Sequence, residues 1–264
     1  MKTGIIGLGN MADAVINGML RKEIVTNKEI FGSAASAGTI SRMAEKYGIR
    51  TTLDNRAVAE SAEVLILAVK PQFLETVIGE IRDSIREETL MITIAAGKSL
   101  GWYEEKFGKK IRLVRCMPNT PAMVGEGCTA VCANENVTEE QLEAALDLLG
   151  SFGHTCVIRE QQMDAFSAVA GSSPAYVFLF IEALADGAVA AGMPRSQAYE
   201  AAAQAVLGSA KLLLESGRHP GDLKDMVCSP GGTTIQGLRV LEERGMRGAV
   251  IDAIGACVEK AGQL

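Results

Sequence analysis

The stretch Lys2-Thr-Gly-Ile-Ile-Gly-Leu-Gly-Asn-Met-Ala12 decides the fold of this 264-residue chain. An apolar run ends at Gly7-Leu-Gly9 and helix-forming residues begin at Met11, which predicts a strand, a tight turn and a helix. The spacing is that of a dinucleotide-binding fingerprint, in which Gly7 permits the turn, Gly9 lets a pyrophosphate approach and Ala12 packs on the strand. Because glycine-rich turns also serve packing alone, the position after the first strand of the chain is what favours cofactor binding.

The composition limits the class of protein. A content of 48% hydrophobic and 22% charged residues is typical of a soluble globular protein. The net charge of −6 argues against nucleic-acid binding. No run reaches the roughly 18 apolar residues of a membrane span, and no export signal precedes the first strand, so we expect a cytoplasmic protein without membrane contact. The six cysteines form no C-x-x-C pair and the chain has two histidines, so we expect reduced thiols and no metal site.

The first half of the chain alternates between strand and helix patterns. Strands separated by helical spacing form βαβ units, so the pattern predicts an α/β, Rossmann-like, doubly wound and mostly parallel sheet over residues 1–159. Strands are expected at Ile5–Leu8, Glu29–Ser33, Glu63–Val69, Leu90–Ala95, Ile111–Arg115, Cys128–Cys132 and His154–Ile158, and helices at 10–21, 40–47 and 72–86.

The second half, residues 160–264, has no strand pattern and is expected to be an all-α domain for dimerisation and substrate binding. Helices are predicted at about 174–191, 195–216, 233–244 and 247–262. The segment 176–191 is apolar around much of its circumference, so it must be enclosed. A helical domain of this size can hardly enclose it alone, which favours packing against a second chain over burial within one subunit.

The end of the second predicted strand bears on the coenzyme. The run Phe31-Gly-Ser-Ala-Ala-Ser36 lacks the carboxylate with which NAD-binding folds hold the adenine ribose. Ser33 and Ser36 could donate hydrogen bonds to the 2′-phosphate of NADP, with Arg42 or Arg56 as charge partners, so NADP is preferred to NAD. The alternative is an ordinary turn.

Three further turns follow predicted strands and should border the same cleft, because ligands bind at the carboxyl ends of such strands. They are Ala68-Val-Lys-Pro71, Ala95-Ala-Gly97 and Cys116-Met-Pro-Asn-Thr-Pro121. Lys70 could contact the phosphate or the ribose of the coenzyme; the alternative is an ordinary surface lysine. Asn119 could lie near the nicotinamide; the alternative is that it only closes a turn.

A second motif, Ser229-Pro-Gly-Gly-Thr-Thr234, precedes a predicted amphipathic helix. A Gly-Gly pair at a helix start exposes backbone donors at the positive end of the helix dipole, which suits a small carboxylate. The alternative is a helix N-terminus without a ligand.

With both motifs, the chain closely resembles the pyrroline-5-carboxylate reductase family over essentially its whole length. The residues that carry the resemblance are Gly7–Ala12, Ala68–Pro71, Met117–Pro121, Pro174–Tyr176, His219–Gly221 and, most specifically, Ser229–Thr234.

The resemblance implies an oxidoreductase that uses NADPH or NADH, forms L-proline, and assembles through its helical domain as an interlocked homodimer or a decamer. The run Ser33-Ala-Ala-Ser36 is less polar than is usual in the family, so the choice between the two coenzymes stays open. The resemblance assigns cofactor contacts to Ile6, Gly7, Leu8, Gly9, Asn10, Met11, Ser33, Asn55, Ala68, Val69, Lys70, Pro71, Ala95, Ala96 and Gly97. It assigns substrate contacts to Ser229, Gly231, Gly232, Thr233 and Thr234.

The expected mechanism is hydride transfer to C5 of a cyclic imine. We expect the backbone N–H groups of Gly231, Gly232 and Thr233 to hold the substrate carboxylate and the catalytic Thr234 hydroxyl to hydrogen-bond the ring nitrogen. A threonine is a poor acid, so it orients the ring rather than supplying the proton. His219 and Asp225 lie near the motif and either take part or are structural.

Two rival functions remain. A β-hydroxyacid dehydrogenase would need a lysine acid/base, and Lys211 is the only lysine in the long central helices. A non-catalytic nucleotide-binding protein could keep the same fold.

Overall fold

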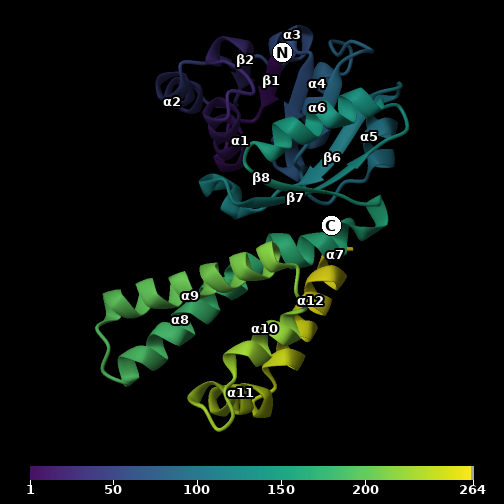
Figure 1. Ribbon diagram of the computed structural model, residues 1–264. Helices are drawn as coiled ribbons and strands as arrows, with labels where there is room; N and C mark the ends of the chain where they lie inside the picture. The colour runs from purple at the N-terminus through teal and green to yellow at the C-terminus, as the bar shows by residue number, and fades with distance from the viewer. Residues whose placement is uncertain (263–264) are drawn as a thin grey trace. The chain divides into compact units, whose positions relative to one another are not determined.

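The computed structural model describes residues 1–262, which fall into two compact units. Unit 1 comprises Met1–Gly171 together with the chain from Val258 onward, and unit 2 comprises Ser172–Cys257. Unit 1 contains the strands, drawn from purple to teal in Figure 1, and unit 2 contains the long green and yellow helices.

The core of unit 1 is an eight-stranded sheet with the order β3-β2-β1-β4-β5-β6-β7-β8. Neighbouring strands are parallel except β6 and β7, which are antiparallel. The strands are β1 (Thr3–Ile6), β2 (Ile30–Ser33), β3 (Arg50–Thr52), β4 (Val64–Leu67), β5 (Leu90–Thr93), β6 (Arg112–Met117), β7 (Gly127–Ala133) and β8 (Gly153–Val157).

Helices cover both faces of this sheet. The α-helices of unit 1 are α1 (Asn10–Arg21), α2 (Ala37–Tyr47), α3 (Asn55–Ser61), α4 (Leu74–Ile81), α5 (Leu100–Phe107), α6 (Glu139–Gly150) and α7 (Met163–Phe166). Short 3-10 helices are η1 (Asn27–Glu29), η2 (Pro71–Phe73), η3 (Thr120–Val124) and η4 (Glu160–Gln162), and η5 (Ser167–Ser172) is a π-helical segment that leads into unit 2.

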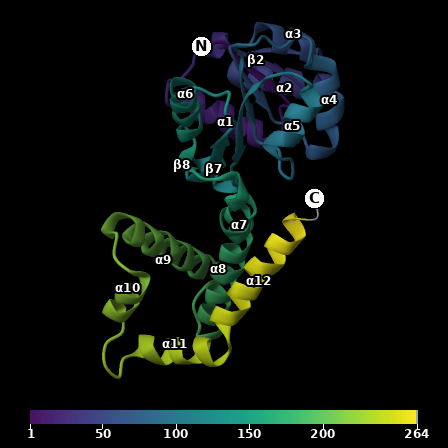
Figure 2. The ribbon, with the colours of Figure 1, turned by 90° about the vertical axis from the view of Figure 1, so that its right-hand side faces the viewer.

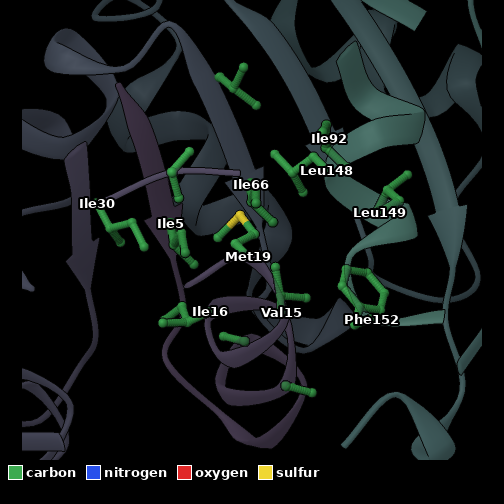
Figure 3. Packing of buried hydrophobic residues seen from close by; sticks show 14 of the residues in the cluster. Ile5, Val15, Ile16, Met19, Ile30, Ile66, Ile92, Leu148, Leu149 and Phe152 are labelled. Atoms are coloured by element: carbon green, nitrogen blue, oxygen red, sulfur yellow. The ribbon is translucent and has the colours of Figure 1, made fainter. Parts of the chain in front are cut away.

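The central strands β1, β4 and β5 are buried at every position, because helices cover both of their faces. Ile5 of β1 pairs with Ile66 of β4, which pairs with Ile92 of β5, and all three side chains contact one layer of helices formed by α1, α2 and α6. Figure 3 shows these three isoleucines with Val15 and Met19 of α1. Alternate residues of the same strands, with Ile6 and Leu65 among them, pack against α3, α4 and α5 on the other face. The two faces together form one complete core.

The doubly wound sheet confirms the predicted fold class, and the seven predicted strands are present within a few residues. Strand β3 and the helices α3, α5, α6, α7 and α10 were not predicted from the sequence. The antiparallel pairing of β6 with β7 was not predicted either.

Unit 2 consists of α8 (Ser173–Ala190), α9 (Arg195–Ser216), α10 (Pro220–Val227), α11 (Thr233–Glu243) and α12 (Met246–Ala261), whose last residues belong to unit 1. Helices α8 and α9 pack against each other, as Figure 2 also shows. The buried residues of these two helices are small, namely Ala185, Ala198 and Ala202. The large apolar side chains Phe178 and Leu179 are 66% and 65% exposed. Helix α8 is therefore not enclosed by the described part of its own chain, contrary to the single-subunit alternative.

One helical stretch, Glu160–Ala190, is long and apolar enough to cross a membrane by length and composition. A helix of a soluble protein can pass the same criterion, so this stretch alone is weak evidence for a membrane span.

Candidate functional site

The turns predicted to bind the coenzyme all lie at one edge of the sheet of unit 1. They follow β2, β1, β4 and β5, which are consecutive in the sheet, and the carboxyl ends of parallel strands meet at one edge. Around β1, Ile6 ends the strand, Gly7–Gly9 form the turn, and Asn10 and Met11 begin α1. Ser33 ends β2, and Asn55 begins α3. Ala68–Lys70 follow β4, Pro71 begins η2, and Ala95–Gly97 follow β5.

The turn after β1 requires glycine at Gly7, and the start of α1 that follows it presents free backbone N–H groups. Gly7 has a φ of +96°, and a Cβ there would lie 2.7 Å from the carbonyl oxygen of Ala68. Gly9 faces open space, where a Cβ would meet nothing within 4 Å. Helix α1 starts at Asn10 without a side-chain cap. Its first N–H groups are therefore available to an anion, as a pyrophosphate site requires.

A cavity of about 220 Å³ opens beside this turn. Its polar wall is a chain of hydrogen bonds: Ser33 Oγ donates to Asn55 Oδ1 at 2.7 Å, and Asn55 Nδ2 donates to Glu80 Oε2 at 2.7 Å. Leu53 and Phe73 give it an apolar wall although they are 57% and 54% exposed. Exposed apolar side chains around a polar anchor are suited to a flat aromatic ring such as adenine. The lining residues are Ile6, Gly7, Ala34, Ala35, Leu53, Asn55, Val69, Phe73, Thr76, Val77 and Glu80.

The hydroxyl groups of Ser33 and Ser36, which are expected to donate to a 2′-phosphate, have partners within the protein. Ser33 is fully buried and donates its proton to Asn55. Ser36 caps α2, since its Oγ donates to Thr39 Oγ1 at 2.9 Å and accepts the Thr39 N–H at 3.3 Å. Both serines thus use their hydroxyl protons within the protein.

A second, smaller cavity lies beside the turn Ala95–Gly97 and is lined in part by Arg115, Cys116 and Asp164. Arg115 is buried and its Nη1 lies 2.7 Å from Glu160 Oε1. The same Glu160 oxygen accepts the N–H of Leu100 at 2.7 Å, at the start of α5. This carboxylate therefore fixes both the end of the turn and the guanidinium beside it.

The thiol in this cavity is not a nucleophile. Complete burial raises the pKa of Cys116 far above its usual range, and its Sγ donates to the carbonyl of Thr93 at 3.2 Å. Because only a thiolate is strongly nucleophilic, Cys116 is inert.

Asn119 is a structural residue rather than a free group near the nicotinamide. Its Oδ1 accepts the N–H of Cys128 at 2.8 Å, and its Nδ2 donates to the carbonyl of Ala170 at 2.9 Å. Of the two alternatives for this residue, the structure supports the turn-closing one.

The motif Ser229–Thr234 is an exposed turn of unit 2 between α10 and α11. Gly231 has a φ of +70°, and α11 starts at Thr233 without a side-chain cap. The N–H of Gly232 donates to the carbonyl of Ser229 at 3.0 Å. The amide of Gly232 therefore has a partner within its own turn, and its expected contact with a substrate carboxylate stays a prediction.

The charged residues around this motif have structural partners. His219 Nδ1 accepts the N–H of Gly221 at 3.1 Å and so caps α10. Asp225 lies 2.8 Å from Lys224. Farther along the chain from the motif, Lys211 of α9 is exposed and lies 3.6 Å from Glu215.

Several cavity residues were not predicted from the sequence, and Leu53, Phe73, Glu80 and Arg115 are among them. Leu53 could have been found from its position, because it is an apolar residue directly before Asp54, the N-cap of α3. Nothing in the sequence pairs Asn55 with Glu80, because the two residues are 25 positions apart.

Family models match both parts of the chain. A model described as pyrroline-5-carboxylate reductase dimerisation matches residues 160–264. A model described as NADP oxidoreductase, coenzyme F420-dependent, matches residues 2–97.

Known proteins resemble the chain over its whole length. The pyrroline-5-carboxylate reductase of Escherichia coli strain K12 is 46% identical, with 100% of this chain and 98% of that protein covered. The solved structure of a pyrroline-5-carboxylate reductase from Coxiella burnetii has a TM-score of 0.94 at 36% identity and covers 99% of this chain and 97% of that one. A Plasmodium falciparum pyrroline carboxylate reductase with NADP bound has a TM-score of 0.89 at 32% identity, covering 100% and 97%. The chain therefore belongs to the pyrroline-5-carboxylate reductase family.

Proposed function

We propose that this protein reduces 1-pyrroline-5-carboxylate to L-proline with NADPH as the hydride donor. The observation that carries the proposal is the 46% identity over the full chain to the Escherichia coli protein of that name. The NADP bound to the Plasmodium falciparum relative supports NADPH as coenzyme, and NADH is an alternative.

The residues of unit 1 fit a dinucleotide. The uncapped start of α1 would hold the pyrophosphate, the cavity beside Asn55 the adenosine, and the turn Ala95–Gly97 the nicotinamide half. When bound, the reduced coenzyme supplies the hydride. The protein contributes mainly binding and orientation, because a protonated imine is already a good hydride acceptor.

The turn Ser229–Thr234 would hold the substrate. The N–H groups of Gly231 and Thr233 are proposed to bind the carboxylate, with the positive end of the α11 dipole behind them. The Thr234 hydroxyl would hydrogen-bond the ring nitrogen and so orient C5. The motif contains no acidic side chain or histidine, so the proton on the ring nitrogen is proposed to come with the substrate or from water.

The helices of unit 2 are proposed to associate with those of a second copy. The exposed side chains of α8 and α12 line an apolar cavity of about 470 Å³, and a patch of this kind marks an association surface. Its lining residues include Leu179, Leu184 and Val250. Further assembly into a decamer, a cytoplasmic location and the absence of membrane and nucleic-acid partners belong to the same proposal.

The test is a steady-state assay of NADPH oxidation with added 1-pyrroline-5-carboxylate, with 3-hydroxy acids and NADP offered in parallel. Imine-dependent oxidation with L-proline as product is the expected result. Turnover of a 3-hydroxy acid alone would support a hydroxyacid dehydrogenase, and coenzyme binding without any turnover would support a nucleotide-binding protein.

A further inference from the structure

We infer that Glu80 is a coenzyme-discriminating residue, whose carboxylate weakens the binding of the 2′-phosphate that distinguishes NADPH from NADH. The inference rests on the proposed function, because it assigns the cavity beside Gly7 to the adenosine half of the coenzyme.

The position of the cavity supports this assignment. In sheets of this topology, the residues that follow the second strand face the 2′ position of the adenine ribose. Here they are Ala34 and Ala35, which carry no polar side chain, and both line the cavity. Glu80 of α4 lines the same cavity, so a carboxylate stands where the sequence after β2 provides none.

The carboxylate is held there by its neighbours. Asn55 Nδ2 donates to Glu80 Oε2 at 2.7 Å, and Asn55 Oδ1 accepts the hydroxyl proton of the fully buried Ser33 at 2.7 Å. The contact with Glu80 fixes which end of the Asn55 amide is the donor, because a carboxylate only accepts; the amide oxygen then faces the Ser33 hydroxyl. The donor end then faces Glu80 and keeps its carboxylate on the cavity wall.

No cation balances this charge among the described residues that line the cavity. Arg56 donates from Nε to the backbone carbonyl of Glu80 at 3.0 Å. Arg50 lies over the ring of Phe31 at 4.3 Å, in β3. Lys46 pairs with Asp13 at 2.7 Å. Arg42 is exposed on α2, and neither it nor Lys70 lines the cavity. Among the described residues, the lining of the cavity thus offers a 2′-phosphate the carboxylate of Glu80 and no cation.

The expected size of the effect is modest. Glu80 is exposed, so water screens its repulsion of a phosphate in the same cavity. The pyrophosphate is common to both coenzymes and cancels in the ratio of their dissociation constants. We expect the charge of Glu80 to raise that ratio, Kd for NADPH over Kd for NADH, about threefold.

The first test compares coenzyme binding by wild type and Glu80→Gln, without imine, by quenching of protein fluorescence. Glutamine keeps an oxygen that accepts from Asn55 but removes the charge. We expect the Kd of NADPH to fall about threefold and that of NADH to stay the same. Glu75→Gln is the matched control, because Glu75 lies on the same helix, pairs with Lys106 at 2.7 Å and does not line the cavity. An unchanged ratio in Glu80→Gln, an equal change for both coenzymes, or the same change in Glu75→Gln would overturn the inference.

The second test needs no variant and therefore holds even if Glu80→Gln does not fold. Raising the salt concentration from about 50 to about 500 mM screens charge interactions. If Glu80 repels the 2′-phosphate, the Kd ratio of NADPH to NADH for the wild-type protein falls. A ratio that rises with salt would show a net attraction by cations and would overturn the inference.

The two proposals fail separately in these experiments. Coenzyme binding with the expected ratios but without imine reduction would remove the proposed function alone. Imine reduction with a Kd ratio that does not depend on Glu80 or salt would remove this inference alone.

Discussion

Units 1 and 2 bury their apolar side chains to very different extents. In unit 1, every residue of β1 and β4 is buried, and helices of the same chain cover both faces of the sheet. In unit 2, Phe178 and Leu179 of α8 and Leu214 of α9 are 66%, 65% and 83% exposed. Burying one such side chain contributes about 1.5–3 kcal/mol, so unit 2 leaves a large stabilisation unused as a single copy. Unit 1 completes its core within one chain, whereas unit 2 leaves large apolar side chains exposed, which is why we propose that a second copy covers them.

The same contrast holds for the proposed site. Unit 1 offers backbone groups and a cavity that its own core fixes, beginning with the turn at Gly7. Unit 2 offers the exposed turn Ser229–Thr234 on helices without a core of their own. We therefore expect coenzyme binding to tolerate changes in unit 2 that abolish turnover.

The largest effect is expected from Leu179→Glu in unit 2. A charge buried without a partner at an interface costs about 3–5 kcal/mol, which is enough to separate the two copies. Sedimentation should show a monomer, and imine reduction should fall at least about 100-fold while NADPH still binds. Ser196→Glu adds the same charge at an exposed position of α9 and should stay associated. An associated, active Leu179→Glu protein would contradict the contrast between the units.

The next effect concerns the core of unit 1. Ile66→Ala removes a side chain that is 1% exposed and should lower the free energy of unfolding by about 2–5 kcal/mol, independently of protein concentration. Ile251→Ala removes a side chain of α12 that is 64% exposed. The Ile251→Ala substitution should therefore weaken the association of two copies, and it should lower the apparent stability only at low protein concentration. Urea titrations at two protein concentrations separate these cases, and the same concentration dependence for both variants would refute the distinction.

A smaller effect is expected from Thr234→Val, which keeps the shape of the side chain and removes its hydroxyl. The loss of a hydrogen bond to a charged ring should cost about 1.5–3 kcal/mol, or about tenfold to 100-fold in kcat/KM for the imine. The Kd of NADPH, measured separately, should stay within about twofold because the proposed coenzyme site consists of residues of unit 1. Unchanged turnover would remove Thr234 from the mechanism.

The smallest effect is expected from Glu29→Gln, which removes the charge of an exposed carboxylate in unit 1. A hydrogen bond from the amino group of Met1, followed by bonds from Thr26, lowers the pKa of Glu29 from 4.5 to about 2. A lowered pKa stabilises the fold above the ordinary value, and the stabilisation is lost as the pH falls from 4.5 toward 2. Glu29→Gln should therefore lower the urea midpoint slightly at neutral pH and not at all near pH 2. An equal difference at both pH values would contradict this origin.

Much of the fold could be predicted because its signals are local. The continuous apolar run that contains β4 and the glycine turn after β1 each act through near neighbours in the sequence. Helix α6 was missed although Thr138 and Gln141 form a capping box at its start, which was a usable signal. Strand β3 gave no apolar signal, because Arg50, Thr51 and Thr52 lie in a short edge strand.

The details of the candidate site depend on contacts between residues far apart in the sequence. Ser33 looked available for a phosphate, but its partner Asn55 is 22 residues away. Asn119 looked available for a ligand, but its Nδ2 bonds a carbonyl 51 residues away. Each of these bonds forms only once the sheet has brought the loops together, so no spacing rule could have indicated them.

We propose that the hydride passes directly from a coenzyme on unit 1 to C5 of the imine. The most direct test uses NADPH that carries deuterium at both hydrogens of nicotinamide C4, with the proline product examined by NMR. Direct hydride transfer predicts one deuterium at C5 of proline for each NADPH oxidised. Proline without deuterium at C5, or imine-dependent oxidation that releases the label to solvent, would contradict it.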